Sequence, residues 1–188
     1  MSRNDKATGE IYEMNKIVLI MGPPGSGKTT ISRGVAKHFP KSLHIQADDL
    51  RGMMVNGIAL PDGGFTEETN RQFQWSRSTA IYMAKLYAEQ DIFVIIDDVS
   101  VPEHFQDHYT NLINHPVVQR VLLLPTESKL IDRIQKRGNP VDNILITYVP
   151  WLYSFLEPMS KEGWIVLDTG DWTIEQTVSE VLARLEVM

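Results

Sequence analysis

Short apolar runs alternate along this chain with stretches of helical periodicity. The runs cover residues 17–21, 42–46, 92–96, 118–124 and 164–167. Each has the length of a β-strand, and continuous apolarity is typical of strands that helices cover on both faces. Strands that alternate with helices indicate βαβ units. We therefore predict an α/β fold of three layers, α/β/α, around a mainly parallel five-stranded sheet.

The predicted helices each bury one face. The buried positions are Ile31, Val35, Ala36 and Phe39 in the helix after the first strand, and Ile174, Val178, Val181, Leu182 and Leu185 in the last helix. Thr173 and Gln176 form a capping box at the start of the last helix, and we expect Thr66 to cap an earlier one. Proline removes a helical hydrogen bond, so Pro150 predicts a break near Val149.

Two stretches are longer than a minimal βαβ pattern requires. Residues 51–90 contain a turn-rich segment and lie between the second and third predicted strands, so they should approach the carboxyl ends of the strands, where ligands bind. We interpret them as a cap over an acceptor substrate. Residues 131–159, basic at first and then aromatic, are predicted to form a lid and a covering helix. Residues 1–16 are expected to be a flexible extension, and residues 17–188 a single domain.

Composition narrows the functional classes. The 188 residues are 43% hydrophobic, carry a net charge of −6 and include no cysteine. The negative net charge gives no electrostatic indication that the protein binds a nucleic-acid duplex or an anionic membrane. The absence of cysteine excludes disulfides and thiolate chemistry. There is no apolar run of the length that a secretory signal or a membrane span requires. We expect a cytoplasmic protein without a membrane partner, and its oligomeric state is left open.

A glycine-rich segment directly after the first strand matches the pattern G-x-x-x-x-G-K-[ST]. Its residues are Gly22, Pro23, Pro24, Gly25, Ser26, Gly27, Lys28, Thr29 and Thr30. Glycines let successive N–H groups point inward, next to the positive end of the following helix, and together these form an anion-binding nest. A plain glycine turn is the alternative, but the flanking strand and amphipathic helix favour a phosphate-binding loop (P-loop).

The chemistry of this loop predicts ATP and Mg²⁺ as cofactors. Lys28 is expected to reach the β- and γ-phosphates, and Thr29 to supply a hydroxyl ligand for Mg²⁺. Thr30 adds a second hydroxyl near the α-phosphate. The fold is therefore predicted to be that of a P-loop NTPase.

An acidic and basic cluster, ADDLR, follows the second predicted strand. A carboxylate there, Asp48 or Asp49, can accept a proton from an attacking hydroxyl, and Arg51 can hold an anionic group. The pattern from the residues alone leaves the choice between the two aspartates open. An aspartate helix cap beside a solvated arginine is the structural alternative.

Two further charged clusters lie where phosphoryl transfer would need them. Asp97 or Asp98, after the third strand, is predicted to orient Mg²⁺. Arg133 and Arg137 lie four residues apart on one helical face, and a lid can bring such charges to the phosphoryl transition state. A solvated helix that also carries acidic residues is the alternative for the second cluster.

The segments GPPGSGKTT, ADDLRGMM, VIIDDVS and RIQKRGN, in this order, resemble the kinase domain of bacteriophage polynucleotide kinase and the small P-loop kinases related to it. The chain is similar in this way to adenylate, shikimate and gluconate kinases. The resemblance implies that Asp48 is the general base and that Arg51 contacts the acceptor. It also implies that Arg137 grips the transferred phosphate, that Arg133 lies nearer the nucleotide, and that Asp98 is the acidic residue at the metal.

The segment after Arg51 departs from this family, so the resemblance does not carry over the acceptor. Phe73 and Trp75 lie in that segment, and Trp75 with Arg77 could hold an acceptor, although aromatic residues on such a helix are more often core. His104 and His108 are set aside as a metal pair because no third ligand is indicated.

The predicted function is transfer of the γ-phosphoryl group of ATP to a hydroxyl of a small molecule. A polynucleotide 5′-hydroxyl is the second choice of acceptor, on motif similarity. A nucleotide-binding switch or an ATPase without an acceptor would use the same phosphate loop, and both remain open on the residues alone.

Overall fold

The computed structural model describes residues 16–61, 64–99, 109, 118–139, 142–159 and 163–185. The helices and strands, in chain order, are β1 (Ile17–Met21), α2 (Lys28–Ala36), β2 (Ser42–Gln46), α3 (Ala47–Gly52), α4 (Glu67–Ala88), β3 (Phe93–Asp98), β4 (Val118–Leu123), α6 (Glu127–Lys136), α7 (Asn143–Met159), β5 (Ile165–Leu167) and α8 (Ile174–Arg184). Each predicted strand is present, with bounds within two residues of those expected.

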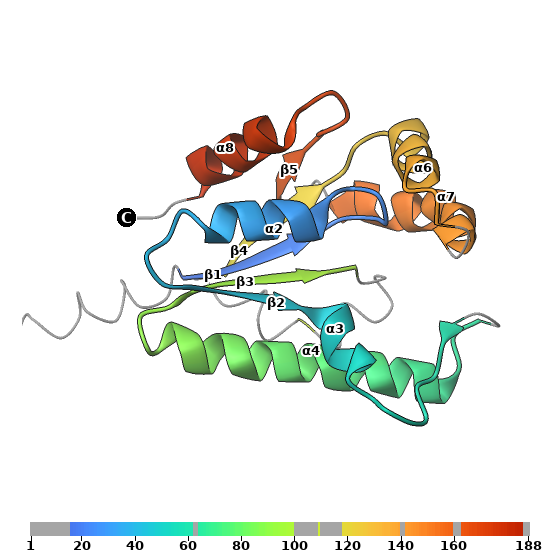
Figure 1. Ribbon diagram of the computed structural model, residues 1–188, viewed down its shortest axis with the longest axis horizontal. Coiled ribbons are helices and arrows are strands. Elements are labelled where there is room, and N and C mark those ends of the chain that lie inside the picture. Colours follow the sequence, from blue (N-terminus) through green and yellow to red (C-terminus); the bar gives the residue numbers. More distant parts are fainter. Residues whose placement is uncertain are drawn as a thin grey trace, which may run out of the picture.

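The strands form one parallel sheet in the order β2-β3-β1-β4-β5, with β1 at its centre. The register aligns Met21, the last residue of β1, with Asp98. It also aligns Gln46, the last residue of β2, with Asp97. The segments that follow β1 and β2 therefore leave the sheet at the same edge as the acidic pair that ends β3 (Figure 1).

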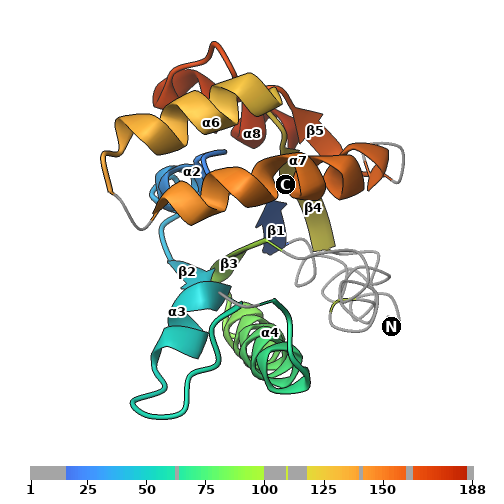
Figure 2. The same ribbon diagram turned by 90° about the vertical axis from the view of Figure 1, so that its right-hand side faces the viewer.

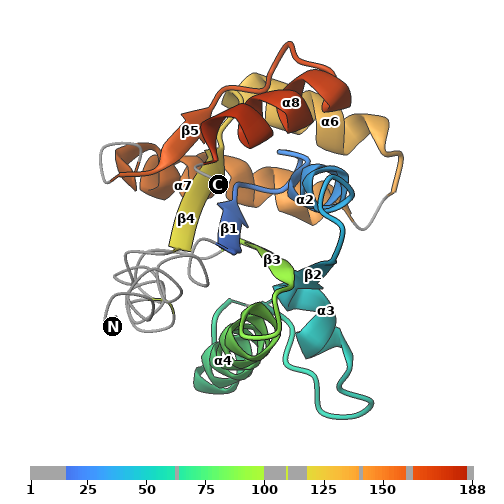
Figure 3. The same cartoon turned by 90° about the vertical axis from the view of Figure 1, so that its left-hand side faces the viewer.

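Helices cover both faces of this sheet. Figure 3 shows α2 and α8 on one face and α4 on the other. The side chains of β1 alternate accordingly, because neighbouring residues of a strand point to opposite faces. Val18 and Ile20 pack in the cluster with α2 and α8, whereas Leu19 and Met21 pack in the cluster with α4. The predicted three-layer α/β fold is confirmed.

Helices α6 and α7 lie beyond the carboxyl ends of the strands and pack against each other (Figure 2). Leu130 and Ile134 of α6 form a small hydrophobic cluster with Val149 of α7. At the other end of α7, Leu156 is fully buried in the main core beside β1 and β4. The pair thus extends from the carboxyl ends of the strands to the main core, and the role of residues 131–159 as a lid and a covering helix stays a prediction.

The structure corrects two details of the sequence prediction. Helix α7 continues through Pro150 rather than breaking near Val149. Pro150 is exposed, and the helical hydrogen bond that its missing N–H cannot make is lost without ending the helix. Ile174, expected in the buried face of α8, is 53% exposed because it occupies the first turn, beyond the edge of the sheet. Both predicted caps are confirmed: Thr66 caps α4, and Thr173 with Gln176 forms the capping box of α8.

Candidate active site

The phosphate loop connects β1 to α2 and has the backbone of an anion nest. Gly25 and Gly27 have φ angles of 85° and 91°, which residues with a side chain rarely adopt. The N–H of Ser26 donates to the carbonyl of Pro23 at 3.1 Å, which closes the turn. Helix α2 begins at Lys28 without an acidic side chain in its first turn. Its positive end is therefore free to attract an anion.

Close packing beneath the loop explains two of its glycines. A Cβ atom on Gly22 would lie 2.5 Å from the carbonyl oxygen of Leu123, and one on Gly25 would lie 2.8 Å from that of Leu130. Both are backbone atoms, so neither contact could be relieved by a side-chain rotation. The loop consequently lies directly against the end of β4 and against α6.

Lys28 lies over this loop in an environment that disfavours its charge. Its Nζ atom is 3.5 Å from the carbonyl oxygen of Pro23. Burial lowers the pKa of Lys28, while the carboxylates of Asp97, Asp48 and Asp98 act in the opposite direction. The positive charge of Arg137 also contributes to lowering the pKa, which places the lid arginine within electrostatic range of the loop. A polyphosphate bound here would add negative charge that favours the charged form of Lys28.

Asp97, rather than Asp98, faces the hydroxyl of the phosphate loop. The Thr29 Oγ1 atom is 3.4 Å from Oδ1 of Asp97, and the other carboxylate oxygen of Asp97 is hydrogen-bonded to Nε2 of His44. The resemblance favours Asp98 as the acidic residue at the metal, with Thr29. The structure brings Thr29 together with Asp97 and does not bring it together with Asp98.

The side chain of Asp98 is committed to a buried ion pair on the other face of the sheet. Its Oδ2 accepts from Nε of Arg77 at 2.7 Å and from the hydroxyl of Tyr109 at 3.0 Å. Arg77 also donates to the carbonyl of Val99 at 2.9 Å. Burial opposes the charge of Arg77, but Asp98, Tyr109 and Asp48 together outweigh it and raise the pKa of the guanidinium. Burial and then Asp98 hold the pKa of Tyr109 well above its usual value. This cluster fixes β3 to α4.

Asp48, the proposed base, lies in the first turn of α3 at the rim of the site. Its outer side is exposed to solvent, yet the protein atoms around the carboxyl raise its pKa, and the negative charge of Asp98 raises it further. The cations Lys28, Arg51 and Arg77 act against these two effects. A carboxylate with a raised pKa is a better proton acceptor than an ordinary one. The structure therefore places a basic carboxylate within electrostatic range of the phosphate-loop lysine.

Arg51 lies over an aromatic ring. Its guanidinium carbon is 4.2 Å from the ring centroid of Phe73, and its Nη1 donates to the carbonyl of Ala59 at 2.9 Å. The segment that carries Ala59 is itself fixed by Gln72 of α4, which accepts from the N–H of Ala59 and donates to the carbonyl of Gly57, both at 2.8 Å. Helix α4 thus orders the cap that surrounds Arg51.

A pocket of about 190 Å³ opens between the phosphate loop, the cap and the lid. It is lined by Pro24, Asp48, Arg51, Pro61, Phe65, Phe73, Arg77, Val99, Leu145, Tyr148, Trp151 and Leu152. The hydroxyl of Tyr148, on α7, donates to the carbonyl of Pro61 at 3.1 Å and so joins the lid to the cap. Residues of the predicted cap thus line this cavity together with Asp48 and Arg51, and its use by an acceptor stays a prediction.

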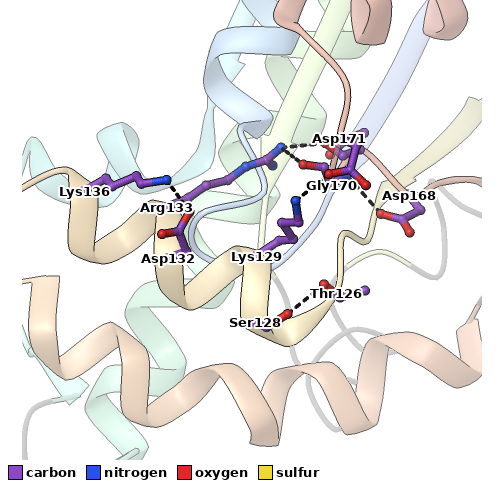
Figure 4. Close-up of polar contacts among 10 residues, drawn as sticks. Thr126, Ser128, Lys129, Asp132, Arg133, Lys136, Asp168, Gly170 and Asp171 are labelled. Carbon is purple, nitrogen blue, oxygen red and sulfur yellow. Dashed lines mark hydrogen bonds and ion pairs between the residues drawn. The ribbon is translucent and has the colours of Figure 1, made fainter.

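The two lid arginines have different surroundings. Arg133 donates to the backbone carbonyls of Thr169 and Gly170, and the neighbouring Lys129 is hydrogen-bonded to Asp171 (Figure 4). These contacts tie α6 to the loop after β5. Arg137, at the end of α6, is half exposed, and its Nη1 lies 3.9 Å from the carboxylate of Asp142. It is therefore only weakly held and can turn toward a phosphate.

Sequence reasoning missed several residues of this site. Phe73 lines the pocket, whereas its neighbour Trp75, suggested as an acceptor contact, is 52% exposed and does not line it. Tyr148 and Trp151, in the aromatic stretch that predicts a covering helix, line the pocket as well. The sequence of α7 does hold a signal for these residues. The buried Val149 is close in sequence to Tyr148 and Trp151, which are less buried and lie on another face of the helix. His104 and His108 lie outside the described residues.

Comparison with known proteins identifies the family. Residues 17–144, more than half of the sequence, match the model of the AAA domain family, AAA_33. The chain belongs to this AAA domain family. Curated relatives are much longer proteins: the chain is 25% identical over 158 residues to the putative pachytene checkpoint protein 2 of Caenorhabditis elegans, a match that covers 79% of this chain and 33% of that protein. The chain is also 27% identical to dynein axonemal heavy chain 1 of Rattus norvegicus, in a match that covers 63% of this chain and 3% of that protein.

Solved structures of similar length show the fold of this family member. A sugar kinase from Janibacter sp. HTCC2649 is 27% identical, with a TM-score of 0.64 over 92% of this chain and 95% of that one. Shikimate kinase from Bacteroides thetaiotaomicron is 18% identical, with a TM-score of 0.65 over 90% and 98%. The α/β sheet and its helices are thus those of P-loop kinases. Among the residues that the structure describes, no helix has the length and apolarity to cross a membrane.

Proposed function

We propose that this AAA domain protein is a kinase that transfers the γ-phosphoryl group of ATP, with Mg²⁺, to a hydroxyl of a small molecule. The observation that carries the proposal is the position of Asp48. It lines a pocket that also borders the phosphate loop at Pro24, and it lies within electrostatic range of Lys28. A basic carboxylate between an acceptor pocket and a phosphate loop is the arrangement that hydroxyl phosphorylation requires.

In this proposal each residue has a defined role. The backbone N–H groups of the phosphate loop bind the phosphates of ATP, and Lys28 neutralises the charge that develops on them. Asp48 accepts the proton of the attacking hydroxyl, while Arg51 holds the acceptor. Arg137 turns from its weak contact with Asp142 to the transferred phosphoryl group, and Arg133 orders the loop beside the nucleotide. Most of the rate enhancement then comes from position and charge.

The residues near the loop fit Mg²⁺ as the metal. Mg²⁺ prefers oxygen ligands and is held in such sites by one or two protein groups together with phosphate oxygens. The Thr29 hydroxyl and the Asp97 carboxylate lie side by side here, with His44 fixing the second oxygen of Asp97. When bound, the metal would supply positive charge to the phosphates. We propose Thr29 and Asp97 as the residues that hold it, in place of Thr29 and Asp98.

The test is transfer of ³²P-labelled γ-phosphate from ATP to two separate pools of acceptors, one of small hydroxyl compounds and one of 5′-hydroxyl oligonucleotides. Label on a small molecule supports the proposal. Label on the oligonucleotide would instead support the second candidate, which rests on the resemblance to polynucleotide kinase. Label only in inorganic phosphate, with every acceptor present, would contradict the proposal in favour of an ATPase, and label that stays on ATP would favour a switch.

Control variants make the result specific. Lys28→Ala should remove transfer in either pool, because Lys28 serves the nucleotide and not the acceptor. Tyr82→Leu is a matched surface control, since Tyr82 is 69% exposed on the long helix α4. It should leave transfer unchanged. A cytoplasmic location and the use of ATP rather than GTP belong to the proposal and are to be measured with it.

A further inference from the structure

Aromatic rings form a continuous wall in the pocket beside Asp48. The ring centroids of Phe65 and Phe73 are 5.8 Å apart, and those of Phe65 and Trp151 are 6.3 Å apart. Tyr148 meets Trp151 edge-on at 6.5 Å. Phe65 and Trp151 both line the pocket and remain 40% and 38% exposed, so neither residue is fully covered by the protein. Such surfaces favour a flat apolar partner, because aromatic pairs gain from ring geometry as well as from burial.

Groups that could bind hydroxyls are scarce in the same pocket. Proline, valine and leucine side chains complete the wall, and the ionic residues among the lining are Asp48, Arg51 and Arg77. Arg77 is already committed to Asp98 and to the carbonyl of Val99. A polyhydroxylated acceptor would bury several hydroxyls without partners, and each would weaken binding on the order of tenfold or more. The wall therefore selects against sugars and sugar acids.

The size of the cavity limits the acceptor to one ring. Its volume is about 190 Å³. For comparison, an engineered apolar cavity of about 150 Å³ in another protein binds benzene. The space beside the loop thus accommodates one six-membered ring and a short substituent, and a fused two-ring system would need the lid to move.

Arg51 defines a polar end for this ring. Its side chain lines the pocket, and its Nη1 atom donates to the carbonyl of Ala59. The guanidinium is positively charged, so a ligand group with negative charge would be favoured beside it. A carbonyl or carboxylate on the ring would serve, because arginine binds such groups with its planar fork.

We propose that the phosphoryl acceptor is a compound with one aromatic ring that bears its reactive hydroxyl on a short arm and a carbonyl or carboxylate that reaches Arg51. The ring lies against Phe73 and Trp151, and the arm brings the hydroxyl to Asp48. The hydroxyl oxygen then forms a bond to the γ-phosphorus as the bond from that phosphorus to the β,γ-bridging oxygen breaks, ADP leaves, and the hydroxyl proton passes to Asp48. This substrate class rests on the proposed kinase function.

The test compares two compounds of matched size and charge. The first, 4-(hydroxymethyl)benzoate, has one aromatic ring, one hydroxyl and one carboxylate, and the second, shikimate, has one non-aromatic ring, three hydroxyls and one carboxylate. 3-(Hydroxymethyl)benzoate extends the aromatic set, and glucose and gluconate extend the polyhydroxylated set. Labelled transfer from ATP and quenching of tryptophan fluorescence are measured for each compound. We expect transfer to the aromatic set with kcat/KM at least tenfold higher than to the other set.

Variants of the wall separate recognition from folding. Phe73→Leu and Trp151→Leu should each raise KM for the aromatic acceptor by about three- to tenfold, with kcat much less affected, because a ring contact is lost and the base is retained. Tyr82→Leu, the exposed aromatic control on α4, should change neither constant. Neither wall residue is fully buried, and the melting temperature of each variant checks that it is folded.

The outcomes distinguish this inference from the function on which it rests. Transfer only to sugars or sugar acids would overturn the aromatic acceptor while the kinase proposal stands. Aromatic compounds that bind at Trp151 without receiving label would contradict the kinase proposal but support the selectivity of the pocket. Equal KM values for wild type, Phe73→Leu and Trp151→Leu would overturn the proposed wall contacts.

Discussion

The phosphate loop, which is the proposed nucleotide side of this site, and the pocket beside it, which is the proposed acceptor side, are built in different ways. The nucleotide side is a contiguous segment in which backbone N–H groups and two left-handed glycines define the shape. The acceptor side is made of side chains from α3, α4, α7 and the segment between α3 and α4. Backbone geometry tolerates few substitutions, whereas a wall of side chains can change one residue at a time.

The same contrast separates Asp97 from Asp98. They are adjacent on β3, so their side chains point to opposite faces of the sheet. Asp97 meets the phosphate loop through Thr29, and Asp98 meets the acceptor side through Arg77. One strand therefore delivers a carboxylate to each half of the site. Substitutions at these two residues and at Asp48 are the sharpest way to test the division.

Asp48→Asn should have the largest effect. Asparagine keeps the shape of the side chain but cannot accept the proton, so we expect transfer to fall by about 10²- to 10⁴-fold. ATP affinity should be unchanged, because Asp48 belongs to the acceptor side. The measurements are kcat for labelled transfer and ATP binding by calorimetry. Asp49→Asn is the matched control on the same helix, and a loss of transfer there instead would reassign the base.

Asp98→Asn should act mainly on stability. It leaves the buried guanidinium of Arg77 without its charge partner, which costs about 3–5 kcal/mol in comparable buried pairs. The free energy of unfolding, from urea titration, measures the effect. Replacing both partners, with Arg77→Met and Asp98→Leu, should recover part of the loss because no unpaired charge remains. If the Asp98→Asn protein is as stable as wild type but needs more Mg²⁺ for transfer, Asp98 rather than Asp97 would be the residue that holds the metal.

Asp97→Asn should weaken the response to Mg²⁺ by about 10- to 100-fold, with stability little changed. The physical reason is the loss of one charged oxygen beside Thr29, while the hydrogen bond from His44 can be kept by the amide oxygen. The Mg²⁺ concentration for half-maximal transfer is the quantity to measure. If this Mg²⁺ concentration is unchanged in Asp97→Asn but higher in Asp98→Asn, the assignment of the two aspartates is reversed.

The smallest expected effect is a gain in stability of Asp48→Asn at neutral pH. The pKa of Asp48 is raised in the folded protein, by burial and by Asp98. The folded state thus binds this proton more tightly than the unfolded state does, and ionisation of Asp48 opposes folding as pH rises. Solvent at its outer edge keeps the effect small.

Melting temperatures of wild type and Asp48→Asn, measured from pH 4 to pH 8, check this linkage. The variant should melt higher at pH 8, and the difference should shrink as the pH falls and the wild-type carboxyl takes up its proton in the folded state. A variant that is less stable than wild type at pH 8 would mean that the ionised carboxylate contributes favourable contacts.

The features that sequence predicts well are those set by local rules. The strands, the phosphate loop and the helix caps depend on neighbours in the chain, so their expected bounds lie close to those observed. The aromatic wall depends on which side chains distant segments bring together. Phe73 and Trp151 are 78 positions apart in sequence. Helical periodicity alone does not tell whether an exposed aromatic faces solvent, as Trp75 does, or a pocket.

The roles of charged residues are hard to predict from sequence for the same reason, because their partners come from distant elements. Two adjacent aspartates at the end of a strand look alike in sequence, and the resemblance favours Asp98 at the metal. The partners that distinguish them, His44 on β2 and Arg77 on α4, come from distant elements. The continuity of α7 through Pro150 has a related cause, because packing at both ends of the helix outweighs one lost hydrogen bond.

The small cluster of Leu130, Ile134 and Val149 between α6 and α7 bears on how such proteins diversify. The two helices pack against each other through these three residues. Tyr148 and Trp151, which are close to Val149 in sequence, line the pocket instead. Selection can therefore alter the pocket-facing positions without rebuilding the helix pair. New acceptors can arise by drift at a few aromatic sites, while the inherited nucleotide chemistry stays intact.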